Sequence, residues 1–125
     1  MKTKINLLLF LSLFSFNVFS APWDGVTKTD WIVTLGVNDG SSVDKPFLID
    51  APEQLAKLAE LVNAGNNYAG KFFKLTTNLD LNNQNWTCIG DINSFSGTFD
   101  GNWHYITNLS ITKWSNNIGL FERSL

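Results

Sequence analysis

The first strong hydrophobic pattern along the chain has the period of an amphipathic helix. Four apolar side chains occupy the i, i+3, i+4 and i+7 positions of one helical stripe: Leu55, Leu58, Ala59 and Val62. Before this stripe, Asp50 offers an N-cap acceptor, Pro52 suits the first turn, and Glu53 is placed as the acid of a capping box. Gly65 is placed to end the helix. The pattern predicts one helix over this stretch, preceded by a short strand at Phe47 to Ile49.

After the helix the pattern changes to the alternation of a β-strand. Every second side chain from Phe73 to Leu81 is apolar or a threonine: Phe73, Leu75, Thr77, Leu79 and Leu81. Four short apolar pieces follow, separated by turns rich in Gly and Asn: Trp86 to Ile89, Phe95 to Phe99, Tyr105 to Ile111, and Ile118 to Phe121. Pieces of this length are typical of short strands stacked in a solenoid or a sandwich. The predicted class is therefore mostly β, with one helix followed by winding strands.

The stretch before the first strand, residues 21–44, is predicted to form a leading flap. It contains Trp23, a short predicted strand from Trp31 to Leu35, and a turn-forming cluster from Gly36 to Ser42. Residues 45–125 then form the helix-containing β domain.

The N-terminus has the features of a secretory signal peptide. Lys2 and Lys4 precede an apolar run from Ile5 to Phe19, and Val18 and Ser20 are small enough for the signal peptidase positions. We therefore predict a signal peptide over residues 1–20 and a mature N-terminus at Ala21. The alternative is an uncleaved membrane anchor, but the run is shorter than the ~20 apolar residues that a spanning helix needs. The predicted location is secreted or at the cell surface.

Composition and charge exclude several classes of protein. The chain has 125 residues, of which 44% are hydrophobic and 16% charged, which suits one globular domain rather than a disordered segment. Loss of the two signal-peptide lysines takes the formal charge from -2 to -4, which gives no basic surface for nucleic acid. One Cys cannot form an internal disulfide, and one His with one Cys cannot form a structural zinc site.

The order of these motifs resembles a known family. The stretch PFLIDAPEQLAKLAELVNAGNNYAGKFFKLTTNLDLNNQNWTCIGDINSFSGTFDGNWHYITNLSITKWSNNIGLF, from Pro46 to Phe121, is similar to the opening of the GLUG-motif surface proteins of bacteria. The similarity lies in a helix ending Val62-Asn63 and Gly65, in a strand ending Leu79-Asp80-Leu81, and in the later motifs. The later matching motifs are Trp86, Ile89-Gly90, Gly97-Thr98-Phe99-Asp100-Gly101-Asn102, Asn108-Leu109 and Gly119-Leu120-Phe121.

Three positions depart from the family pattern. Cys88 replaces a usual Pro, Trp103 replaces a usual Gly, and Glu122 replaces the last Gly of the naming motif.

The resemblance implies a right-handed parallel β-helix, a solenoid whose first coils are capped by the helix. It also implies a non-catalytic exported module for surface attachment or adhesion, with no catalytic residues. The alternative is the N-terminal cap region of a larger exported enzyme, such as an immunoglobulin A peptidase or a polysaccharide-degrading enzyme. An uncovered last coil would leave an apolar layer and unpaired strand backbone, so we expect self-association through the open C-terminal edge.

The residues that could take part in catalysis or metal binding are expected to have structural roles instead. Asp80, Asp91 and Asp100 are expected to accept hydrogen bonds in turns or caps. The segment from Asp91 to Phe95 lacks the glycine and the distal Glu of a calcium loop, and Asp100-Gly101-Asn102 is itself a turn signature. His104 is expected to be a turn histidine, and Cys88 a small buried hydrophobic residue. We therefore predict no catalytic residue, no cofactor and no metal.

The five tryptophans fall into two groups. Trp23, Trp31 and Trp86 are expected to pack in a small core. Trp103 and Trp114 each interrupt a polar stretch and are the candidate surface-contact residues, for a carbohydrate, a host surface or a protein partner. A core or edge-covering role is the alternative for both, and the frequency of buried aromatics favours it.

Overall fold

Five short strands and one helix form the regular structure of the described part of the chain. The structure is a computed structural model of the 125-residue chain, and it describes residues 19–27, 30–115 and 117–122. The elements in chain order are β1 (Phe47–Ile49), α1 (Pro52–Asn63), β2 (Phe72–Leu75), β3 (Leu79–Asp80), β4 (Thr98–Asp100) and β5 (Ile106–Thr107). The fold is mostly β with one helix, as the sequence predicts.

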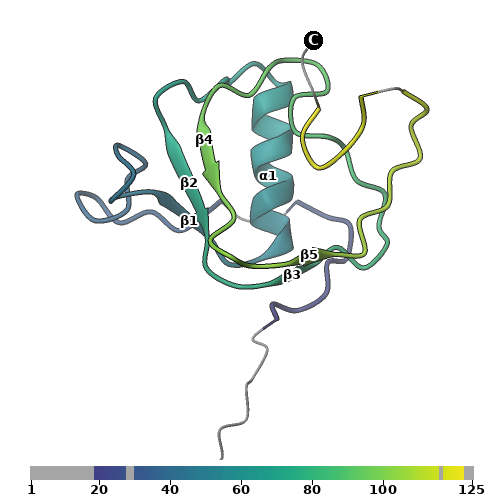
Figure 1. Ribbon diagram of the computed structural model, residues 1–125, viewed down its shortest axis with the longest axis horizontal. Helices are drawn as coiled ribbons and strands as arrows, with labels where there is room; N and C mark the ends of the chain where they lie inside the picture. Colours follow the sequence, from purple (N-terminus) through teal and green to yellow (C-terminus); the bar gives the residue numbers. More distant parts are fainter. Residues whose placement is uncertain (1–18, 28–29, 116, 123–125) are drawn as a thin grey trace, which may run out of the picture.

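All strand pairs are parallel, and their register repeats. In the sheet β1-β2-β4, Phe73 pairs with Phe47 on one side and with Phe99 on the other, so each partner lies 26 residues away in sequence. In the second sheet, β3 pairs with β5, with Leu79 opposite Ile106. Neither sheet closes on itself. A nearly constant offset means that successive windings of the chain lie on top of one another (Figure 1).

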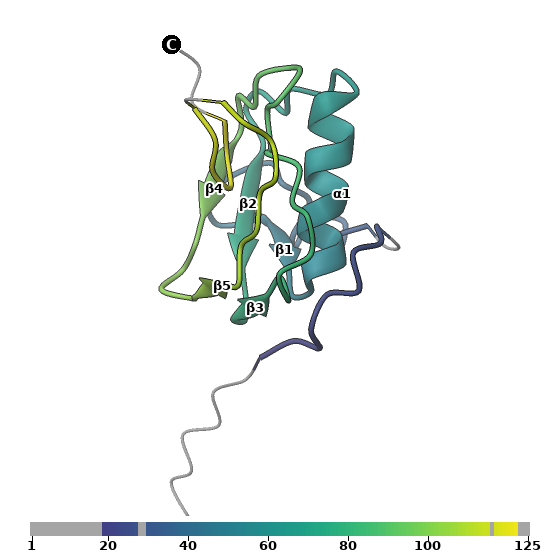
Figure 2. The ribbon, with the colours of Figure 1, turned by 90° about the vertical axis from the view of Figure 1, so that its right-hand side faces the viewer.

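The windings form layers. Figure 2 shows β4, β2, β1 and α1 in that order across the molecule. We call residues 71–89 the inner coil and the described residues of 95–121 the outer coil. β1 and α1 lie on one side of the inner coil, and the outer coil lies on the other side.

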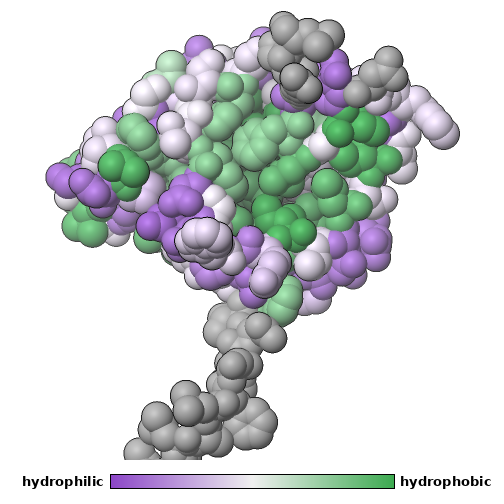
Figure 3. Space-filling model, viewed as in Figure 1, coloured by the Kyte–Doolittle hydropathy of each residue, from purple (hydrophilic) through white to green (hydrophobic). Residues whose placement is uncertain are grey.

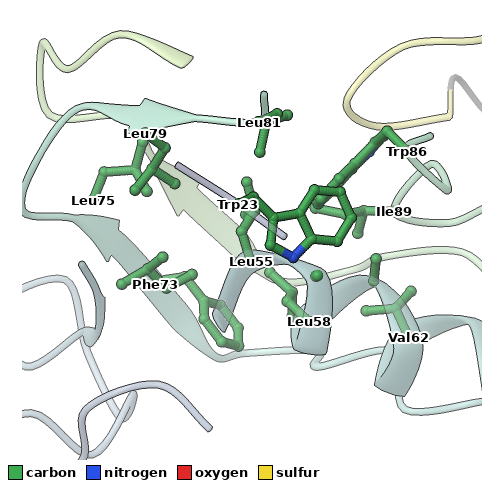
Figure 4. Packing of buried hydrophobic residues seen from close by; sticks show 13 residues of the cluster. Trp23, Leu55, Leu58, Val62, Phe73, Leu75, Leu79, Leu81, Trp86 and Ile89 are labelled. Carbon is green, nitrogen blue, oxygen red and sulfur yellow. The ribbon is translucent and has the colours of Figure 1, made fainter. Parts of the chain in front are cut away.

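The core lies between α1 and the inner coil. The helix contributes a stripe of buried side chains, including the four apolar positions predicted from the sequence: Leu55, Leu58, Ala59 and Val62. The inner coil contributes the side chains that alternate in the sequence, followed by two more: Phe73, Leu75, Leu79, Leu81, Trp86 and Ile89. In Figure 4 the labelled side chains of the two groups point toward one another. Both hydrophobic patterns are confirmed.

The helix begins one residue later than predicted. Its N-cap is Ala51, not Asp50, and no side chain of the cap residue bonds to the helix. Instead, Oε1 of Gln54 accepts the backbone N–H groups of Asp50 (2.7 Å) and Ala51 (3.2 Å). The reaching-back half of a capping box is therefore supplied by Gln54, not Glu53. At the other end, Ala64 is the C-cap and Gly65 has φ +112°, which confirms the predicted stop.

The alternating stretch is divided between two strands, which corrects the expectation of one. A corner separates β2 from β3, and the backbone N–H of Thr76 there donates to the carbonyl of Ile49 (3.0 Å). The buried side chain of Asn78 accepts the N–H of Tyr105 (2.8 Å). The bend turns the chain from one sheet into the next while the alternate side chains stay inside.

The predicted strand from Trp31 to Leu35 is wrong. Only two isolated antiparallel bridges occur there, Ile32 with Leu48 and Thr34 with Asn38. The side-chain amide of Asn38 donates to the carbonyl of Ile32 (2.6 Å), so the segment folds back on itself after one pairing with β1.

The predicted signal peptide lies outside the described residues except at its last two positions. Phe19 forms a parallel bridge with Asn78, and the N–H of Ser20 donates to the carbonyl of Asn78 (3.2 Å). Beyond the predicted cleavage site, the N–H of Trp23 donates to the carbonyl of Asp80 (3.0 Å). Within the described ranges, no helix has the length and apolar character required to span a membrane.

Candidate functional site

The corner that follows β4 presents Trp103 to solvent. Oδ1 of Asp100 accepts the N–H of Asn102 (2.8 Å), and the Asn102 amide donates to the carbonyl of Leu75 in the inner coil (3.1 Å). The N–H of His104 closes the turn on the carbonyl of Gly101 (2.9 Å). Asn102 and Trp103 have φ values of +48° and +61°, so the chain reverses and the indole of Trp103 is 99% exposed.

Trp114 is also fully exposed, at 100%, on a different loop of the outer coil. The loop is fixed just before it, because the backbone N–H (3.2 Å) and the hydroxyl (2.8 Å) of Thr112 both donate to Oδ1 of Asn85. Lys113 forms an ion pair with Asp91. These exposures exclude a core position for either Trp103 or Trp114, which corrects the alternative that residue frequencies favoured.

The other three tryptophans pack, as predicted. Trp23 and Trp86 are 5% and 2% exposed, and their rings meet edge to face with centroids 5.5 Å apart. Trp31 is partly buried against Phe47 and Phe73, at 5.5 and 5.1 Å between ring centroids.

The three candidate aspartates have structural partners. Asp80 and Asp100 each accept the N–H of the asparagine two residues later, which confirms their predicted turn role. Asp91 is paired with Lys113, and the hydrogen bond from the Lys113 ammonium lowers the pKa of the Asp91 carboxyl while raising that of the lysine. No group of three or more His, Cys, Asp or Glu within the described residues could hold a metal ion.

His104 and Cys88 occupy the positions expected of structural residues. Nδ1 of His104 lies 3.3 Å from Oδ1 of Asn78, the same oxygen that accepts the N–H of Tyr105. Cys88 is a free, buried thiol that is 3% exposed, as predicted for a small hydrophobic residue.

A groove that the hydrophobic patterns did not predict lies between α1 and the chain around Trp23 and Trp86. It has a volume of about 490 Å³, within the range of small-molecule sites, and its helix wall is formed by Ala56, Ala59, Glu60 and Asn63. Both indole N–H groups are already bonded, Trp23 to the carbonyl of Val26 (3.0 Å) and Trp86 to that of Leu120 (3.2 Å). Because both rings are almost fully buried, the groove offers no aromatic face for a ligand to stack on.

The outer coil carries an apolar face on the side away from α1. We call this surface the end face and define it by six partly buried side chains: Phe95, Phe99, Ile106, Ile111, Leu120 and Phe121. Figure 3 shows apolar residues gathered across the middle of this side of the molecule, which is the side nearest β4. The ring of Phe121 lies 5.4 Å from that of Phe95 and 5.2 Å from that of Phe99, so the face has a continuous aromatic part.

The chain matches no protein-family model, and we found no similar curated protein and no similar solved structure.

Proposed function

We propose that the chain is an exported, non-catalytic surface or adhesion module that contacts a carbohydrate or protein partner through Trp103 and Trp114. The observation that carries this proposal is the conformation of Trp103. A bulky residue at φ +61° is strained, by about 1–3 kcal/mol, in a position that glycine adopts freely. Packing of the indole does not offset this strain, because the side chain is 99% exposed.

Backbone strain at a residue whose aromatic side chain is fully exposed favours a role in binding a partner. Aromatic residues are the most frequent anchors of binding interfaces, and an indole buries a large area when a sugar ring or a protein covers it. The GLUG-motif resemblance adds to this, because Trp103 stands where those proteins usually have the glycine that the conformation prefers.

We propose further that the fold is the start of a right-handed parallel β-helix capped by α1. Three features support it: the parallel pairing of the five strands β1 to β5, the 26-residue register of Phe47, Phe73 and Phe99, and a helix that covers one end of the stack. An amphipathic helix at that end shields apolar side chains and strand edges from water.

Export is the third part of the proposal. The backbone bond from Trp23 to Asp80 lies beyond the predicted cleavage site, so cleavage after Ser20 leaves it in place. N-terminal sequencing of secreted protein should begin at Ala21. Secreted material that begins at Met1, or beyond Pro22, would contradict the predicted cleavage.

The alternative function is the N-terminal cap region of a larger exported enzyme, of the immunoglobulin A peptidase or polysaccharide-degrading kind. The partly exposed apolar side chains of the end face favour it, because another coil could continue the stack there. A downstream reading frame that encodes further coils or a zinc-protease motif would decide for this alternative.

The contact proposal is tested by retention on defined surfaces. The secreted chain is incubated with peptidoglycan, chitin, cellulose and cultured epithelial cells, and the bound fraction is measured. The variants are Trp103→Gly and Trp114→Ala, with Leu35→Ala as the control because Leu35 is 90% exposed on the leading flap.

We expect wild type and the control to bind at least one surface, and W103G to bind at least about tenfold more weakly. W103G should also be at least as stable as wild type, because it removes the strain. Absence of wild-type binding from all four surfaces, or equal binding by all variants, would overturn the proposal.

A further inference from the structure

We propose that the end face binds a second copy of this chain, face to face across a twofold axis, with the two β4 strands paired antiparallel at Phe99. This inference rests on the proposed layered fold. It does not involve Trp103 or Trp114, so it stands or falls separately from the proposed surface contact.

The two ends of the stack are covered differently. On the α1 side, the helix packs on the inner coil, Ile32 pairs with β1, and the chain at Trp23 pairs with β3. On the other side, β4 and β5 each have a strand partner only toward the inner coil among the described residues. The apolar side chains of the end face remain partly exposed there.

Backbone groups at the end face are oriented for further pairing. The N–H of Thr98 donates toward the inner coil, to the carbonyl of Lys71 (2.8 Å). The carbonyls of Tyr105 and Thr107 also face inward, where they accept the N–H groups of Leu79 (2.9 Å) and Leu81 (3.0 Å). Because backbone groups of successive strand residues point to opposite sides, those of Phe99 and Ile106 point outward.

The short β4 edge is complementary to itself when two copies run antiparallel. With Phe99 opposite Phe99, the two residues can exchange both N–H to C=O bonds, as the hydrogen-bonded pairs of antiparallel strands do. Thr98 of each copy then lies opposite Asp100 of the other, so no like charges face each other. A parallel in-register pairing would instead place Asp100 opposite Asp100, which is unfavourable.

The different covering of the two ends of the stack limits the assembly to two copies. A head-to-tail chain of molecules would need a second open end, but α1 covers the other end of the stack. An interface that uses the same patch on both partners closes on itself, so it gives a dimer and not a filament.

Charge variants at Thr98 test this geometry directly. Thr98 is exposed in the isolated molecule, so substitutions there leave the core unchanged. Thr98→Asp would place like charges opposite each other twice in the dimer, and Thr98→Lys would place opposite charges together twice. Sedimentation equilibrium of the secreted chain over a concentration series gives the dimer dissociation constant of each form.

We expect a closed dimer whose dissociation constant rises about two- to thirtyfold in T98D and falls by a similar factor in T98K. Leu35→Lys, a charge introduced on the exposed flap, should leave it unchanged. Thermal unfolding of each variant at low concentration checks that the monomer is folded.

A monodisperse monomer at all concentrations would overturn the proposal and leave the end face to a further coil or another partner. Open-ended aggregation, or shifts in the same direction for T98D and T98K, would also overturn it, because neither is compatible with the twofold pairing at Phe99.

Discussion

Asn102 and Asn82 hold two different corners of the stack in the same way. Each has a left-handed backbone, with φ values of +48° and +53°, and each donates its backbone N–H to the aspartate two residues earlier at 2.8 Å. Each also donates its side-chain amide to a carbonyl of the neighbouring layer, Leu75 for Asn102 (3.1 Å) and Trp23 for Asn82 (3.0 Å). An Asp-x-Asn turn thus ends a strand and binds one layer to the next.

Substitutions at Asn102 should separate what the left-handed backbone and the side-chain amide bond each contribute to the free energy of unfolding. Asn102→Gly keeps the backbone conformation but loses the amide bond, and should lower the free energy of unfolding by about 0.5–1.5 kcal/mol. Asn102→Ala loses both, and should cost about 1 kcal/mol more, because alanine is strained at positive φ. Urea unfolding measures both, with the same pair at Asn82 as a replicate. Equal losses for Gly and Ala would contradict the role of the left-handed conformation.

The buried face of α1 should contribute a large part of the stability. Leu58 is fully buried, so Leu58→Ala should lower the free energy of unfolding by about 2–4 kcal/mol. Leu61→Ala, a partly exposed position on the same helix, is the matched control and should cost less. A loss below about 0.5 kcal/mol at Leu58 would mean that the helix does not cover the inner coil.

Two glycines of the leading flap allow a comparison of strain with steric overlap. Both have positive φ, +75° at Gly36 and +71° at Gly40, but only at Gly40 would an added Cβ meet the ring of Phe47, at 2.6 Å from Cζ. Gly36→Ala should cost about 1–2 kcal/mol, from the backbone alone. Gly40→Ala should cost about 1–3 kcal/mol more, from the overlap. Thermal unfolding that ranks the two equally would show that Gly40 is not packed against Phe47.

The hydrophobic patterns predicted the helix and its buried side chains correctly. They did not predict which side chain caps the helix, because that depends on individual hydrogen bonds. Asp50 has the residue type of an N-cap, yet Gln54 bonds the free N–H groups, because its longer side chain reaches back past Ala51. We therefore expect Gln54→Ala to cost about 0.5–2 kcal/mol in unfolding free energy, and Asp50→Ala clearly less. A larger loss for D50A would return the capping role to Asp50.

The polar neighbours of Trp103 indicated a surface position, but residue frequencies favoured a buried one, so the sequence left both open. A tryptophan in a short domain is usually buried, and only the consecutive left-handed residues Asn102 and Trp103 direct this one outward.

The predicted strand from Trp31 to Leu35 did not form, and the reason is a local hydrogen bond that the alternation of apolar residues does not show. The bond from Asn38 to Ile32 folds the segment into a turn, and a side chain that bonds the backbone locally competes with strand pairing.

The proposed β-helix and the proposed dimer both depend on the stacking of the outer coil on the inner coil in parallel register. The most direct test is NMR detection of scalar couplings across the hydrogen bonds between the two coils. We expect couplings from the amide nitrogens of Leu79, Trp86 and Thr98 to the carbonyl carbons of Tyr105, Ser110 and Lys71, respectively. Couplings that fit antiparallel pairs, or that connect these amides to other residues, would contradict the layered fold and every function proposed from it.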